Sequence, residues 1–125
     1  MLEKITELAE KQKKISDFHL RSESDIAYRL LGDIIVAPDS KISEKDLEDL
    51  LKKNCSESDI KKFNSHWELD TAVMLGSLRF RANFFKTLNG SGAVLRRVET
   101  KVPLMDDLML PQVLYELLDA QKGLV

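Results

Sequence analysis

Four arginines that could bind an anion lie close together in one stretch of this chain: Arg79, Arg81, Arg96 and Arg97. A guanidinium group forms paired hydrogen bonds with the oxygens of a carboxylate or a phosphate. Side chains two residues apart on a strand point to the same face, so Arg79 and Arg81 could approach one anion. Arg96 and Arg97 are adjacent and would point to opposite faces, so only one of them could join that site.

A two-stranded ribbon must hold these arginines in place. Apolar and polar side chains alternate over residues 78–84, which is the pattern of a strand with one buried face and one wet face. Asn89 and Gly90 tolerate positive φ, and a second apolar run covers residues 93–98, so an antiparallel hairpin is predicted. The alternative to an anion site is that Arg79 and Arg81 form a solvated strand face or ion pairs with Glu68 or Asp70.

The remaining reactive side chains predict no catalytic residue and no metal site. Asp17 and His19 share one side of a predicted strand, where Asp17 could fix the tautomer of a structural His19. His66 lies at the end of a predicted helix, and Cys55 has no cationic neighbour in the sequence that would activate its thiol. Two histidines and one cysteine scattered along the chain do not form a metal-binding pattern.

The composition is that of one ordinary globular domain. The chain has 125 residues, of which 43% are hydrophobic and 32% are charged. Its 19 Lys and Arg residues and 21 Asp and Glu residues leave a net charge of -2, which disfavours nucleic-acid binding and requires any anion site to be local. No leader-like or membrane-spanning apolar run is visible, so we expect a cytoplasmic location and no direct membrane insertion.

The spacing of apolar residues predicts the elements of the first half of the chain. A helix is expected over residues 2–14, followed by strands over residues 17–21, 26–31 and 34–36. A polar loop over residues 22–25 should join the first two strands. Pro38, Asp39 and Ser40 are expected to end the third strand. Ser43 and Ser56 begin sequences typical of capping boxes, and each should start a helix.

Strand character returns over residues 67–75, and Trp67, Phe80 and Phe84 are expected in the core. Pro111 fits the first turn of a last helix, with Leu114 and Leu117 on its buried side together with Leu118. The order is then α-β-β-β-α-α-β-β-β-α, without regular alternation of strands and helices. This order predicts a single α+β domain in which helices cover an antiparallel sheet.

Six segments of the chain, taken together, resemble the front part of the bacterial secretion and pilus ATPases. Among these ATPases, the similarity is greatest to the type IV pilus retraction, or twitching motility, members. The segments follow in the family's order and spacing: Asp17-Phe18-His19-Leu20, Leu31-Gly32-Asp33, Glu68-Leu69-Asp70, Leu78-Arg79-Phe80-Arg81-Ala82-Asn83-Phe84, Gly92-Ala93-Val94-Leu95-Arg96-Arg97-Val98 and Leu108-Met109-Leu110-Pro111.

The resemblance implies a PAS-like amino-terminal domain over residues 1–122, with residues 123–125 beginning the link to a motor domain. The chain itself contains no Gly-x-x-x-x-Gly-Lys-Ser/Thr phosphate-binding loop, so no catalysis is expected from it alone. The implied role is regulation of a hexameric ATPase that powers pilus retraction. Arg81, with Arg79, would contact the terminal phosphates of ATP, and Arg96 or Arg97 would help line the nucleotide pocket.

The implied cofactor is ATP with Mg²⁺, held by the motor domain, and none is expected for this domain in isolation. The implied partners are the motor domain of the same or a neighbouring subunit, further copies in a homo-hexamer, and the inner-membrane platform of the pilus. Two alternatives remain from the sequence. One is a PAS-like module that binds a small ligand, and the other is the same domain of a type II or IVB secretion or conjugation ATPase.

Overall fold

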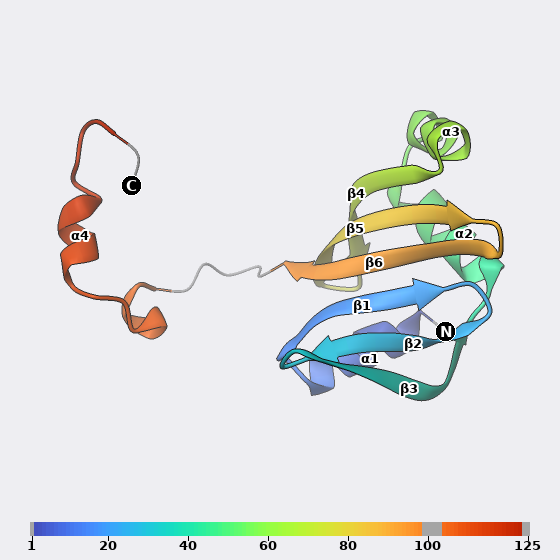
Figure 1. Cartoon of the computed structure of the whole chain (residues 1–125), viewed down its shortest axis with the longest axis horizontal. Helices are drawn as coiled ribbons and strands as arrows, with labels where there is room; N and C mark the ends of the chain where they lie inside the picture. Colours follow the sequence, from blue (N-terminus) through green and yellow to red (C-terminus); the bar gives the residue numbers. More distant parts are fainter. Residues whose placement is uncertain (1, 99–103, 124–125) are drawn as a thin grey trace.

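The computed structural model describes residues 2–98 and 104–123 (Figure 1). The first half of the chain consists of a helix, a three-stranded meander and two further helices: α1 (Glu3–Lys11), β1 (Ile15–Arg21), β2 (Ser24–Leu30), β3 (Asp33–Ile42), α2 (Glu44–Asn54) and α3 (Glu57–His66). A second meander and a short helical segment follow: β4 (Glu68–Leu75), β5 (Leu78–Thr87), β6 (Gly90–Val98), the 3-10 helix η1 (Asp106–Leu108) and α4 (Val113–Leu117).

All six strands form one antiparallel sheet in the order β3-β2-β1-β6-β5-β4. Each meander contributes three neighbouring strands, and the two meanders join where β1 pairs with β6. In Figure 1, helices α1 and α2 lie behind this sheet and α3 lies beside β4. The predicted α+β class, a single domain with helices on an antiparallel sheet, is therefore confirmed. None of the described helices covers the front face of the sheet, which we call the open face.

Aromatic side chains fill the layer between the sheet and the helices. Phe18 and Phe80 come from opposite meanders, and their ring centroids lie 5.9 Å apart in an edge-on arrangement. Phe63 of α3 meets Phe84 of β5 in the same way at 6.3 Å. The predicted burial of Phe80 and Phe84 is confirmed, at 0% and 2% exposure. Such close aromatic contacts indicate a filled core.

The two predicted capping boxes are present at the starts of α2 and α3. The Ser43 hydroxyl accepts a hydrogen bond from the backbone N–H of Asp46, whose carboxylate accepts one from the Ser43 backbone. Ser56 and Asp59 form the same reciprocal pair. These bonds satisfy backbone donors that a helix start otherwise leaves unpaired.

Three predictions about individual segments are wrong. Strand β3 does not end at Pro38, because an edge strand tolerates a proline that lacks an N–H donor. Trp67 does not lie in a strand or in the core: it ends α3 in a left-handed conformation and is 49% exposed. Strand β2 begins at Ser24, inside the predicted loop.

The prediction that the last helix has a buried side is also wrong. Helix α4 spans only Val113–Leu117 and contains no buried residue, and Leu117 and Leu118 are 45% and 62% exposed. The described residues from 104 to 123 thus take no part in the core. Of the predicted link over residues 123–125, residues 124–125 lie outside the described residues. No helix in the described part of the chain has the length and apolar character needed to cross a membrane.

Candidate functional site

Three of the four predicted arginines lie together on the open face of the sheet. Arg79 and Arg81 are exposed on β5, two residues apart. Strand β6 pairs with β5 so that Arg96 lies directly opposite Arg81. Because residues directly opposite in an antiparallel pair share a face, Arg96 joins Arg79 and Arg81.

Arg97 lies on the helix-covered face and is bound there. Its register partner is Phe80, whose side chain is fully buried. The Nη1 atom of Arg97 donates hydrogen bonds to the carbonyl oxygen of Ala9 at 3.0 Å and to that of Lys13 at 3.4 Å. Carbonyl groups at the end of a helix lack partners within the helix, so Arg97 stabilises the end of α1. Of the adjacent pair, it is therefore Arg96 that faces the candidate site.

Within the described residues, no carboxylate lies within ion-pairing distance of Arg79, Arg81 or Arg96. Glu68 and Asp70, the expected alternative partners, instead accept hydrogen bonds from the Asn83 amide at 3.2 and 3.0 Å. Like charges directly opposite each other on paired strands are destabilising. The Arg81–Arg96 pair therefore carries a like-charge repulsion that a bound anion would relieve.

A shallow depression of about 240 Å³ marks this position on the open face. Its lining comes from three neighbouring strands: Asp70, Arg81, Ala82, Asn83, Val94 and Arg96. Two guanidinium groups thus border a space large enough for a phosphate group, and the Asp70 carboxylate at its edge already accepts a hydrogen bond from Asn83. Such a site can bind and orient an anion.

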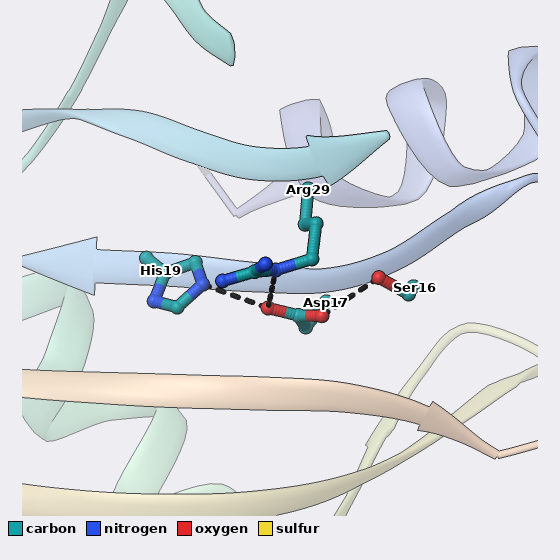
Figure 2. A network of polar contacts seen from close by, with 4 residues as sticks. All are labelled: Ser16, Asp17, His19 and Arg29. Carbon is teal, nitrogen blue, oxygen red and sulfur yellow. Dashed lines mark hydrogen bonds and ion pairs between the residues drawn. The ribbon is translucent and has the colours of Figure 1, made fainter. Parts of the chain in front are cut away.

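An acidic centre lies next to the arginines, on β1 (Figure 2). Asp17 pairs in register with Arg96 on one side and with Arg29 on the other. Its carboxylate accepts hydrogen bonds from Ser16 Oγ and His19 Nε2, both at 2.7 Å, and lies 3.7 Å from Arg29 Nε. The predicted contact between Asp17 and His19 is therefore present. Sequence reasoning missed Arg29, because its place beside Asp17 depends on strand register.

The environment of Asp17 favours its ionised form. Burial alone would raise the pKa of this carboxyl group, since its exposed fraction is only 8%. The hydrogen bonds from Ser16 and His19, together with the charges of His19 and Arg29, outweigh burial and hold the pKa of Asp17 below its usual value. The open face thus carries a row of charges across four strands: Arg29, Asp17, Arg96 and Arg81.

The other candidate residues have local structural contacts. His66 Nδ1 donates a hydrogen bond to the Lys62 carbonyl oxygen at 3.0 Å, within α3. Burial raises the pKa of the Cys55 thiol, which makes it less reactive. In the part of the chain that the structure describes, no group of three or more His, Cys, Asp or Glu side chains is placed to hold a metal ion.

No protein-family model matches this chain. The sequence is similar to two curated proteins from Pseudomonas aeruginosa. The type IV pilus retractation ATPase PilT is 31% identical over 111 residues, and the type IV pilus ATPase PilU is 26% identical over 115 residues. These matches cover 88% and 91% of this chain, but 32% and 30% of PilT and PilU. The chain thus spans about a third of the length of the curated relatives it matches.

Two solved structures are similar to this chain, and one of them is a structure of PilT. The crystal structure of the pilus retraction motor PilT with bound ADP matches 94% of this chain and 34% of the PilT chain, at 29% identity and a TM-score of 0.76. The Legionella pneumophila ATPase DotB matches 98% of this chain and 35% of its own, at 20% identity and a TM-score of 0.71. The likeness to DotB concerns the fold alone.

The fold defines a class: an α+β domain like the one found in the pilus retraction motor PilT. Relatives of this chain include the type IV pilus ATPases PilT and PilU. Since nearly the whole chain matches about a third of each, it has the extent expected of their amino-terminal domain.

Proposed function

We propose that this chain is the regulatory amino-terminal domain of a hexameric ATPase that powers pilus retraction. In this proposal, Arg81, Arg96 and Arg79 contact the phosphates of ATP that is held, with Mg²⁺, by the motor domain of the same or a neighbouring subunit. The observation that carries the proposal is the exposed Arg81–Arg96 pair, which has no carboxylate partner among the described residues. The similarity to pilus ATPases supports phosphate as the anion.

The arginines would act by binding phosphate oxygens, and the domain would perform no catalysis alone. A hydrogen bond between charged groups is worth ~1.5–3 kcal/mol when water is excluded. A terminal phosphate that contacts both Arg81 and Arg96 would therefore favour the position in which this domain lies against the nucleotide of the motor domain. Loss of that phosphate would restore the repulsion between the two guanidinium groups. Nucleotide state and domain position would be coupled in this way.

The filled aromatic core argues against the alternative that this domain binds a small ligand in its interior. The rings of Phe18, Phe80, Phe63 and Phe84 occupy the layer in which an internal ligand would have to lie. This packing supports a domain that acts through its surface. The proposed setting is the cytoplasmic side of the inner membrane, where the hexamer would meet the pilus platform.

The test of this proposal is ATP turnover by the complete polypeptide that contains this domain. We expect Arg81→Ala to lower kcat about 10-fold, because one charged hydrogen bond to phosphate is lost. Circular dichroism and hexamer formation should not change, since Arg81 is exposed. The matched control is Arg21→Ala, another exposed arginine on the sheet, located at the far end of β1. Unchanged turnover in a folded Arg81→Ala hexamer would refute the phosphate role.

A further inference from the structure

An exposed leucine occupies a strained position at the turn between β2 and β3. Leu30 and Asp33 are paired, so Leu31 and Gly32 form a two-residue turn. Both have positive φ, 52° for Leu31 and 91° for Gly32. Asn, Asp or Gly normally fills the first position of such a turn, because a larger side chain is strained there. Leu31 is nevertheless 74% exposed, so the fold gains no core packing from this side chain.

Cationic side chains surround this turn. Lys13, Lys14 and Arg29 line, together with Leu31, an open depression of about 830 Å³ that continues to Arg96. Ile34 lies opposite Arg29 in the register of β2 and β3 and is 51% exposed. We call the set Lys13, Lys14, Arg29, Leu31 and Ile34 the basic tip. In Figure 1 the loop before β1 and the turn after β2 lie at the same end of the sheet.

Two carboxylates lie near the basic tip and reduce its charge only in part. Asp17 already accepts hydrogen bonds from Ser16 and His19 and lies against Arg29. Asp33 is exposed and follows the turn. Asp17 thus offsets Arg29, and Lys13 and Lys14 face the exposed Asp33, so a net positive charge remains here although the whole chain has a net charge of -2. The positive charge is a local property of this end of the sheet.

We propose that the basic tip binds the surface of an anionic lipid bilayer. Such a surface presents anionic headgroups directly above an apolar layer, which matches cations arranged around a projecting leucine. The long stems of Lys13 and Lys14 can lie along the apolar boundary while their amino groups stay among the headgroups. An acidic protein would need a shaped apolar socket for Leu31, whereas a bilayer needs none. This contact goes beyond the proposed phosphate role and does not depend on it.

The experiment measures co-sedimentation of the chain with vesicles of phosphatidylcholine alone or mixed with phosphatidylglycerol. We expect binding only to the mixed vesicles, weakening as salt is added. Leu31→Asn should reduce the partition coefficient roughly tenfold, because the apolar anchor is lost. Since asparagine tolerates positive φ, this variant should melt at the same or a higher temperature than the unchanged chain. A folding defect therefore cannot explain its loss of binding.

The charge contribution is tested with a matched pair of double variants. Lys13→Ala with Lys14→Ala should lower the partition coefficient roughly thirtyfold, because each surface cation contributes to attraction by anionic headgroups. Lys52→Ala with Lys53→Ala removes the same charge from the exposed side of α2 and should leave binding unchanged. Equal losses for both pairs, or no loss for Leu31→Asn, would overturn the proposal. Binding to soluble polyglutamate that is as tight as vesicle binding would point to an acidic protein instead.

Discussion

Asp17 is the acidic residue in the row of charges on the open face, and it contacts His19 and Arg29. Its folded-state pKa lies below the ordinary value, because hydrogen bonds and nearby cations outweigh its burial. The folded chain therefore binds fewer protons at this site than the unfolded chain does. The resulting stability is fully present above the ordinary pKa of aspartate and is lost as the pH falls through the lower folded-state pKa.

Asp17→Asn should therefore cost about 1 kcal/mol of unfolding free energy at pH 7. The cost should shrink as the pH falls below the ordinary aspartate pKa, because protonation removes the same charge from the unchanged chain. Urea unfolding at a series of pH values measures both quantities. Asp49→Asn, at an exposed position of α2, is the control and should change stability by ~0.5 kcal/mol or less. A cost for Asp17→Asn that is the same at every pH would contradict the electrostatic explanation.

Part of this residue-scale arrangement could be predicted from the sequence. Period-two alternation places Arg79 and Arg81 on one face and separates Arg96 from Arg97, and the structure has both features. The sequence could not identify the neighbours across the sheet. Those depend on register, which long-range packing decides, and so neither the Arg81–Arg96 pair nor the place of Arg29 was predicted.

At the scale of elements, the irregular pairing of β3 explains why this strand continues past Pro38, where it was predicted to end. Pro38 and Asp39 are turn-forming residues, and Asp39 does adopt a positive φ of 55°. The register between β2 and β3 is irregular at this point, yet pairing resumes beyond it with Asp25 opposite Lys41. The hydroxyl of the fully buried Ser40 accepts a hydrogen bond from the Ile26 N–H at 2.9 Å and donates one to the Ala37 carbonyl at 2.6 Å. A side chain thus replaces ladder bonds that the irregularity removes, which alternation alone cannot indicate.

Ser40→Ala should destabilise the chain by about 1–3 kcal/mol, because it leaves a buried N–H and a buried carbonyl without a partner. Chemical denaturation measures the difference in unfolding free energy. Hydrogen exchange should also show faster exchange at the Ile26 amide than in the unchanged chain. Ser58→Ala, at an exposed position of α3, is the matched control and should cost little. Equal stability of the two variants would show that the Ser40 hydroxyl does not support the irregular pairing.

At the scale of the whole molecule, the core belongs to the first part of the chain. Every residue of the core cluster lies between Ile5 and Leu95, and both meanders contribute to it. Composition, element order and the apolar faces of the strands were enough to predict this α+β core. The exposure of α4 could not be predicted, because a stripe of leucines indicates an apolar face but does not identify the surface that covers it.

A chain that ends at Val98 should consequently be as stable as the whole chain. None of the described residues from 104 to 123 is buried, so their removal exposes no core surface. We expect urea midpoints that correspond to stabilities within ~0.5 kcal/mol of each other. Removing residues 2–11 instead takes away the buried Ile5 and Ala9 and one of the two carbonyl groups that Arg97 binds, which should cost ~3 kcal/mol or more. A clear loss of stability in the chain ending at Val98 would mean that the last segment packs on the domain in solution. If stability is instead retained, the exposed leucines of α4 are free to contact the rest of a longer polypeptide.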